Sequence, residues 1–183
     1  KMTAGLEIWK SVRAQGIQAE FLATGQIGIT ISGIGIPLDA IRVDYAGGAV
    51  EKMVLDAADA ALAIVEGQGS LLHPGSTSTL PLLRGACPTH LILCHRAGMT
   101  ELDTVGVTVK VPPLNEVIAL YEDVASACGI YPRPVTVGIA LNTAHLNDDQ
   151  AQRAVSETAD ATGRLVLDPV RQGCDRWVDA LMA

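Results

Sequence analysis

Short apolar segments alternate along this chain with longer segments of helical periodicity, and this alternation constrains the fold more than any other feature. Strands are predicted at residues 19–23, 61–65, 90–94, 135–141 and 165–167. Helices are predicted at residues 3–15, 38–58, 79–85, 114–128, 148–162 and 174–181. Strands that alternate with helices at this spacing form a parallel, doubly wound sheet with right-handed crossovers. The sequence therefore predicts an α/β fold with a mostly parallel sheet.

The composition and charge of the chain restrict its partners and its location. Apolar residues make up 49% of the chain and aromatic residues 3%, a balance that suits a parallel sheet covered by helices. The net charge of −7 leaves no basic stripe for a nucleic acid, and no segment is apolar enough to span a membrane. The cysteines form no CxxC pair, so they predict neither a zinc site nor a disulfide framework. We expect one cytoplasmic domain, residues 1–183, that forms a homo-oligomer and binds a small molecule.

Each predicted strand is followed by polar residues or glycines. In parallel α/β sheets, ligands bind beyond the carboxyl ends of the strands, so function is expected at that edge. The residues at these ends are Thr24, Gly25, Glu66, Gly67, Gly69, His95, Arg96, Asn142, Thr143 and Asp168.

The segment AIVEGQGSLLHPG, residues 63–75, carries the strongest candidate for catalysis. Glu66 ends a buried strand and is interpreted as a general base, with a Mg²⁺ ligand or a turn cap as the alternative. Gly67 and Gly69 let the backbone approach a ligand closely, and their amides are candidate donors to an oxyanion. His73, restrained by the following proline, is a candidate second base or substrate clamp, or else a hydrogen-bonded structural histidine.

The first residues, KMTAGLEIWK, place Lys1 at the head of a predicted helix. A phosphate-binding P-loop runs from a strand through GxxxxGK[ST] into a helix, and Lys1 fits its lysine if a strand and glycine loop precede it. The residue after that lysine normally binds Mg²⁺ through a hydroxyl, but here it is Met2. Thr3 lies one position further, turned by about 100° around the helix. This weakens the case for ATP hydrolysis and leaves phosphate binding intact.

Other side chains are candidate ligand contacts. Asn142, with Thr143 beside it, is placed either to contact the edge of a nucleobase or to cap the following turn. Arg96, just beyond a strand end, is the best placed guanidinium for substrate carboxylates, and Asp44 is the helix carboxylate expected to face the site. The glycines of residues 24–37 lack the GxGxxG spacing of a dinucleotide site and predict a mobile loop that closes over the ligand.

The segment VEGQGSLLHP, with ATGQIGITISGIGIPLDAIRVDYAGGAVE before it and VGIALNT after it, resembles the P-loop family that includes D-glutamate N-acetyltransferase. The resemblance extends from Lys1 to about Asp168, and the family is distantly similar to dethiobiotin synthetases. It implies a P-loop NTPase-like, three-layer α/β domain whose first strand and most of whose P-loop precede Lys1. It also implies that residues 1–183 are the C-terminal domain of a longer, two-domain protein.

The resemblance implies an N-acetyltransferase that moves the acetyl group of acetyl-CoA to the amine of an acidic D-amino acid such as D-glutamate. One alternative is a ligase that uses ATP and Mg²⁺, with the metal at Glu66 and Thr3, and another is a nucleotide-binding module without chemistry. The candidate catalytic residues are Glu66 and His73, and the candidate phosphate- or nucleotide-binding residues are Lys1, Thr3, Asn142 and Thr143. The candidate substrate-binding residues are Thr24, Gly25, Asp44, Gly67, Gly69 and Arg96.

Overall fold

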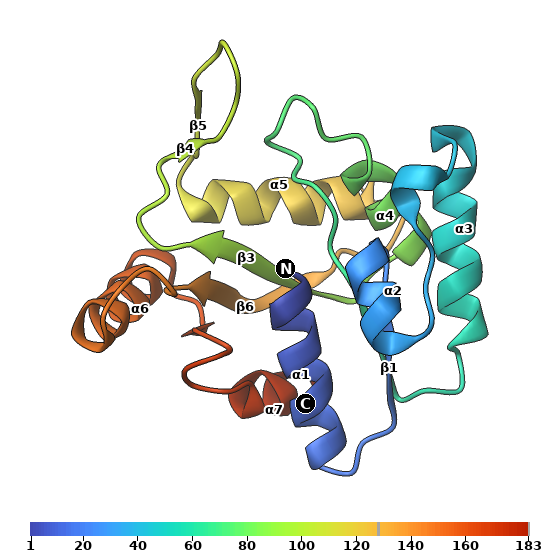
Figure 1. Cartoon of the computed structure of the whole chain (residues 1–183), viewed down its shortest axis with the longest axis horizontal. Helices are drawn as coiled ribbons and strands as arrows, with labels where there is room; N and C mark the ends of the chain where they lie inside the picture. The colour runs from blue at the N-terminus through green and yellow to red at the C-terminus, as the bar shows by residue number, and fades with distance from the viewer. Residues whose placement is uncertain (128, 183) are drawn as a thin grey trace. The chain divides into compact units, whose positions relative to one another are not determined.

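The computed structural model describes residues 1–127 and 129–182, which fall into two compact units, Lys1–Pro88 and Thr89–Ala183 (Figure 1). The first unit contains α1 (Met2–Ala14), β1 (Ala19–Leu22), α2 (Gln26–Ser32), a 3₁₀ turn (Leu38–Ala40), α3 (Val43–Asp56), β2 (Leu62–Val65) and α4 (Thr79–Ala86). The second contains β3 (His90–Arg96), β4 (Glu101–Leu102), β5 (Val109–Lys110), α5 (Leu114–Ser126), β6 (Val135–Asn142), α6 (Asp148–Thr162), β7 (Val166–Leu167) and α7 (Asp175–Met182).

The first unit is built on a parallel pair of strands. β1 and β2 pair in register, with Leu22 opposite Val65, so both strands end at the same edge. The indole of Trp9 on α1 donates to the carbonyl of Ala19, at 2.9 Å, and thereby ties this helix to the start of β1. Helices α3 and α4 pack around a core of apolar side chains. That core contains Leu38, Ala46, Val50 and Leu82.

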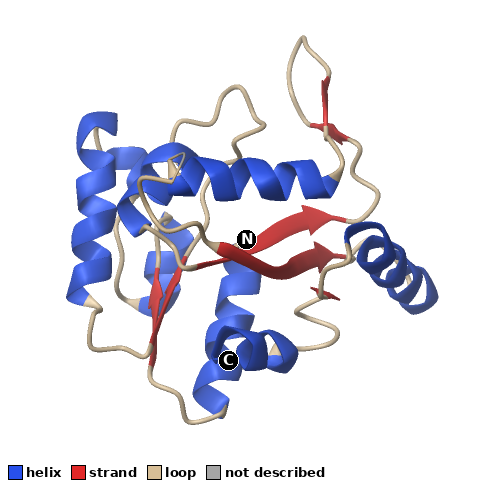
Figure 2. Ribbon diagram, turned by 180° about the vertical axis from the view of Figure 1, so that it is seen from behind, coloured by secondary structure: helices blue, strands red, loops and turns tan. Residues whose placement is uncertain are grey.

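The second unit is built on three parallel strands in the order β3, β6, β7, with β6 in the centre. Figure 2 shows β3 and β6 side by side, with α5 running along them. The core combines Ile139 and Leu141 of the central strand with Ile118 of α5 and Val155 of α6. Apolar side chains at helical spacing on α5 and α6 cover this sheet. The antiparallel β4–β5 hairpin projects from the end of β3 (Figure 1).

The prediction of an α/β fold with parallel strands is confirmed, and all five predicted strands are present. β3 runs two residues further than predicted, so His95 and Arg96 belong to the strand. The helix predicted at 148–162 matches α6, which begins with a capping box between Asn147, the N-cap, and Gln150. The helix predicted at 114–128 ends at Ser126, and Cys128 lies outside the described residues. In the described part of the chain, no helix combines the length and apolarity needed to cross a bilayer.

Two predictions for the first unit are wrong. Residues 24–37 do not form one long loop, because Gln26–Ser32 is the helix α2 and Gly35 then forms an isolated parallel bridge with Ala23. The helix predicted at 38–58 is divided, because Arg42 has an extended backbone (ψ 136°) between the 3₁₀ turn and α3. The residue that precedes a helix, its N-cap, usually has such a non-helical backbone, so Arg42 is the N-cap of α3 and the helix begins at Val43.

Candidate functional site

Glu66 joins the ends of the two strands in the first unit. The residue is only 5% exposed, and its Oε2 accepts hydrogen bonds from the backbone N–H groups of Thr24, at 2.9 Å, and Gly25, at 3.2 Å. The Thr24 hydroxyl donates to the backbone carbonyl of Glu66, at 2.8 Å. Because the sheet register places the ends of β1 and β2 side by side, the carboxylate and these amides meet. Thr24 is buried and acts here as a partner of Glu66.

Gly28 makes room for the Glu66 carboxylate. A Cβ on Gly28 would lie 2.4 Å from Oε2, a distance too short for any non-bonded contact. Gly28 is in the first turn of α2, whose N-cap, Gly25, has no side chain to cap the helix. The Glu66 carboxylate supplies the negative charge that favours a helix start. The glycine is thus required by space, and a residue with a side chain here would displace the carboxylate.

The second carboxylate oxygen of Glu66 differs from the first. Among the described residues, Oε1 has no hydrogen-bond partner. In the described chain, the side-chain polar atoms that lack both a hydrogen-bond partner and contact with solvent are Thr136 Oγ1 and Trp177 Nε1. Oε1 is not one of these atoms, so it keeps contact with solvent. One oxygen is therefore fixed by the protein and the other is open to a ligand. An oxygen in this position can accept a proton or coordinate a cation.

The loop after Glu66 is held by hydroxyl groups. Gly69 has a left-handed backbone (φ +65°), and a Cβ there would lie 1.9 Å from Ser76 Oγ. Ser76 Oγ accepts from Ser70 N at 3.0 Å and lies 2.9 Å from Thr79 Oγ1, which donates to the carbonyl of Gln68 at 2.8 Å. This glycine and the hydroxyl cluster fold the loop back onto the start of α4.

His73 is placed in the same loop and helps to shape it. Its Nδ1 accepts a hydrogen bond from Gly75 N at 3.1 Å, which puts the ring proton of a neutral imidazole on Nε2. The sequence left open whether His73 is a base, a substrate clamp or a structural histidine. The contact with Gly75 gives it a structural function in this loop.

Lys1 lies against the Glu66 loop. Its Cδ is 3.4 Å from the position that a Cβ would take on Gly67, and its side chain forms no ion pair with any described residue. Lys1 is the N-cap of α1 without a side-chain cap, so the first amides of this helix are open to an anion. Thr3 is exposed in the first turn of α1. Asp44 is exposed in the first turn of α3, and in the described structure no hydrogen bond or ion pair joins it to Glu66.

The donor set around Glu66 fits a loosely held cation better than a caged one. No three His, Cys, Asp or Glu side chains in the described chain are grouped to hold a metal. Mg²⁺ is commonly held by one or two carboxylates together with water and substrate phosphates. Glu66 Oε1 is the oxygen that would serve such an ion here.

The strand ends of the second unit form a separate group of predicted residues. Arg96 is opposite Asn142 in the register of β3 and β6, and Ala97 N donates to the carbonyl of Asn142 at 3.0 Å. Asn142 Oδ1 accepts from Ala144 N at 3.0 Å. This is the geometry of a turn cap, one of the two roles predicted for Asn142 from the sequence; the other was contact with a nucleobase. Its side-chain amide nitrogen is left for a ligand, because Asn142 is exposed.

Thr143 and Asp168 are buried together behind this edge. The Thr143 amide donates to Asp168 Oδ2 at 3.1 Å, and the Thr143 hydroxyl donates to the same oxygen. Asp168 Oδ1 accepts from the amides of Val170, at 2.9 Å, and Arg171, at 3.2 Å. Burial alone would raise the pKa of Asp168, but these hydrogen bonds, the Thr143 hydroxyl first, lower it below its usual value of 3.8. The side chain of Thr143 thus supports the loop and does not face solvent.

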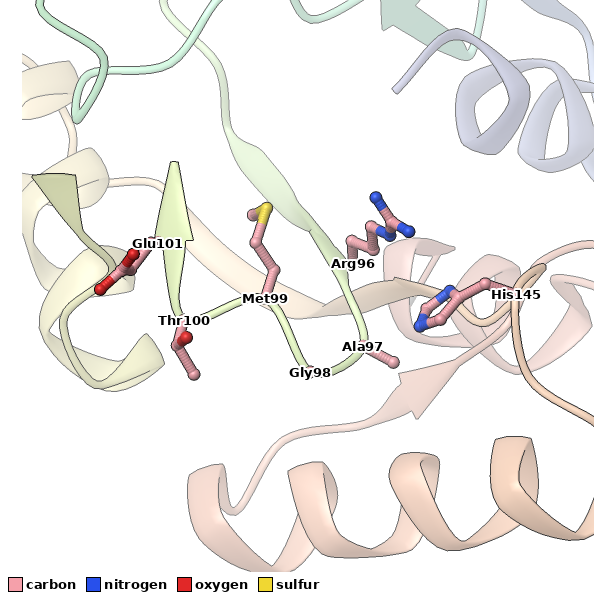
Figure 3. A pocket seen from close by; sticks show the side chains of 7 residues that line it. All are labelled: Arg96, Ala97, Gly98, Met99, Thr100, Glu101 and His145. Carbon is pink, nitrogen blue, oxygen red and sulfur yellow. The ribbon is translucent and has the colours of Figure 1, made fainter. Parts of the chain in front are cut away.

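A pocket of about 390 Å³ opens beside Arg96 and is shown in Figure 3. The turn after β3 forms one wall, and His145, three residues after Asn142, lines the other. His145 was not predicted, because a single exposed histidine in a loop carries no local pattern. His95, the residue before Arg96, is half-buried in β3, and burial lowers the pKa of its imidazole below 6.5.

Comparison with known proteins agrees with the fold. A family model described as "Domain of unknown function (DUF1611_C) P-loop domain" matches residues 1–178. The chain is 37% identical to a D-glutamate N-acetyltransferase of Tritonibacter scottomollicae, over 100% of this chain and 54% of that protein. It is 35% identical to a D-glutamate N-acetyltransferase of Pseudoalteromonas sp, over 97% of this chain and 53% of that protein.

A solved structure is also similar. The crystal structure of a DUF1611 family protein from Anabaena variabilis is 49% identical to this chain, with a TM-score of 0.94, and the match covers 99% of this chain and 52% of that one. The chain thus spans about half the length of the relatives that it matches. The match of the family model over nearly all of its residues shows that the chain belongs to the DUF1611 P-loop domain family.

Proposed function

We propose that this domain takes part in the transfer of an acetyl group from acetyl-CoA to the amine of an acidic D-amino acid, D-glutamate. The observation that carries the proposal is the Glu66 carboxylate, with Oε2 fixed by two backbone amides and Oε1 open. Two relatives at 35–37% identity that bear the name D-glutamate N-acetyltransferase support the reaction class. A base at the end of a parallel strand, in a family of P-loop domains, suits a reaction between a phosphate-bearing donor and an amine.

The proposed reaction assigns one task to each group. Glu66 Oε1 takes a proton from the substrate ammonium, and the free amine then attacks the thioester carbonyl carbon. The new C–N bond forms, the C–S bond breaks, and the CoA thiolate leaves and takes up a proton. Backbone amides of the loop at Gly67 are the candidate donors to the carbonyl oxygen as it becomes negative. Lys1 and the uncapped first amides of α1 are the candidate ligands for the phosphates of CoA.

The test measures release of the CoA thiol by the full-length protein, with D-glutamate and L-glutamate in parallel and without ATP. We expect release that depends on D-glutamate. Glu66→Gln should lower kcat by about 10²- to 10⁴-fold, the usual contribution of a general base. The glutamine oxygen can still accept the two hydrogen bonds from Thr24 and Gly25, so this change removes the basic oxygen and keeps the local fold. Glu51→Gln, an equal charge change at an exposed position of α3, is the matched control and should retain full activity.

Two results would contradict the proposal. Formation of ADP when ATP, Mg²⁺ and an acceptor are added, without thiol release from acetyl-CoA, would indicate the ligase reaction. Tight nucleotide binding without turnover of any acceptor, with Glu66→Gln altering affinity alone, would indicate a binding module without chemistry.

A further inference from the structure

We propose that Arg96 and His145 form a binding site for an oxyanion, a carboxylate or a phosphate, at the pocket beside the end of β3. The pocket lies within the second unit and has a volume of about 390 Å³. The choice of ligands tested below rests on the proposed function, and the existence of the anion site does not.

The two walls of the pocket are joined by the sheet. Arg96 is the last residue of β3, and the backbone then turns sharply through Gly98, whose φ is +72°, with Met99 N donating to the carbonyl of Arg96 at 3.1 Å. The bond from Ala97 N to the carbonyl of Asn142 holds this turn to the loop that carries His145. Figure 3 shows the imidazole of His145 pointing toward the turn at Ala97, and the Arg96 side chain lying between those of Met99 and His145.

The two side chains proposed to bind the oxyanion have no partner in the described protein. Arg96 and His145 form no ion pair and donate no side-chain hydrogen bond to any described residue. Two other arginines of the unit differ, because Arg133 pairs with Glu122 and Asp123, and Arg171 pairs with Asp148. A planar guanidinium presents a fork of N–H donors that matches the two oxygens of a carboxylate or phosphate. An unpaired guanidinium beside an imidazole is thus a complete donor set for one oxyanion.

The loop that carries His145 is fixed before any ligand binds. On one side of His145, Thr143 is buried and bonded to Asp168. On the other side, the carbonyl of Leu146 accepts a hydrogen bond from Arg171 Nη2 at 2.8 Å, and Leu146 N donates to the carbonyl of Thr143 at 2.9 Å. A site whose backbone is already ordered loses less conformational entropy on binding, which favours affinity.

The charges of the pocket favour a ligand with one anionic end. Glu101 also lines the pocket, and Figure 3 places it on the opposite side from Arg96. A negative group there disfavours a second anion and suits an ammonium or a neutral group. The ligand is therefore expected to place an oxyanion at the Arg96 end of the pocket. Two molecules of the proposed reaction contain such a group. These are the acidic amino acid, through a carboxylate, and CoA, through its 3′-phosphate.

The experiment is a binding cycle by isothermal titration calorimetry on the full-length protein. The first pair of ligands is D-glutamate and D-glutamine, which differ by one carboxylate. The second pair is acetyl-CoA and acetyl-dephospho-CoA, which differ by the 3′-phosphate. In the wild type, we expect the anionic member of one pair to bind about tenfold or more tightly than its neutral or less charged partner. Arg96→Gln should reduce that ratio to near one, and His145→Gln should reduce it in part.

Arg153→Gln is the matched control, because Arg153 is exposed on α6 and does not line the pocket. Loss of the ratio for the glutamate pair assigns the site to a substrate carboxylate, and loss for the CoA pair assigns it to the phosphate. The proposal is overturned if neither pair binds, or if Arg96→Gln and His145→Gln change both ratios no more than Arg153→Gln does. If the cycle gives the expected loss while acetyl transfer is undetectable, the anion site stands and the proposed function fails.

Discussion

Glu66 and Asp168 are two buried carboxylates at the ends of parallel strands, and they use their oxygens differently. Glu66 is 5% exposed and Asp168 is 4% exposed, and both accept backbone N–H groups. Asp168 accepts on both oxygens, from Thr143 on one and from Val170 and Arg171 on the other. Glu66 accepts on Oε2 alone. The two carboxylates thus share burial and strand position, but the protein binds both oxygens of Asp168, whereas Glu66 leaves Oε1 without a partner among the described residues.

The largest expected difference between these carboxylates is in stability after amide substitution. Asp168→Asn places an NH₂ group against N–H donors whichever way the amide turns, because every hydrogen-bond partner of the Asp168 carboxylate is a donor. We expect it to lower the free energy of unfolding by about 2–4 kcal/mol, the cost of leaving buried donors unsatisfied. Glu66→Gln leaves one oxygen for both amides and should cost less than about 1.5 kcal/mol. Urea denaturation of the two variants measures this, and equal losses would contradict the distinction.

The second comparison tests the space that Gly28 leaves for Glu66. Gly28→Ala gains up to about 1 kcal/mol of helix propensity but forces a methyl group to 2.4 Å from Oε2. We expect a net loss of about 1–2 kcal/mol from the overpacking, together with reduced acetyl transfer because the carboxylate must move. Gly48→Ala is the control, since Gly48 lies in α3 with no atom within 4 Å of its added Cβ and should be stabilised by about 0.5–1 kcal/mol. A gain from both substitutions, measured by urea denaturation, would refute the steric argument.

Much of the fold follows from local pattern, and α2 shows where pattern is insufficient. The strands were predicted correctly from short apolar runs, and most helices from apolar residues at helical spacing. In α2, Ile27 and Ile31 are 66% and 55% exposed, so its apolar residues do not mark a buried face of the unit. Gly28 belongs to the segment that the sequence predicts as a mobile loop, but in the structure it makes room for the carboxylate of Glu66. Glu66 is 42 residues from Thr24, one of its hydrogen-bond partners, so no local pattern reveals this contact.

The candidate site could be read from the sequence only where a single strand end carries it. Glu66 and its glycines stand out because a carboxylate directly follows a short apolar run. The pocket at Arg96 depends instead on the register between β3 and β6, which brings His145 near a turn far from it in sequence. The bond between Thr143 and Asp168 likewise joins residues 25 apart. Long-range pairings of this kind leave no periodic signal in a single sequence.

The smallest expected effect is the pH dependence that Asp168 contributes. The hydrogen bonds of the folded state lower the pKa of Asp168 below 3.8, and the unfolded chain has no such bonds. The folded state thus favours the ionised carboxylate, so its stabilising contribution is complete above the unfolded pKa and is lost as the pH falls through the folded one. The stability difference between the wild type and Asp168→Asn should therefore be constant from about pH 7 to pH 5 and shrink below about pH 4. Urea denaturation at each pH measures it, and a difference that grows in acid would mean that the carboxylate is protonated more readily in the folded protein.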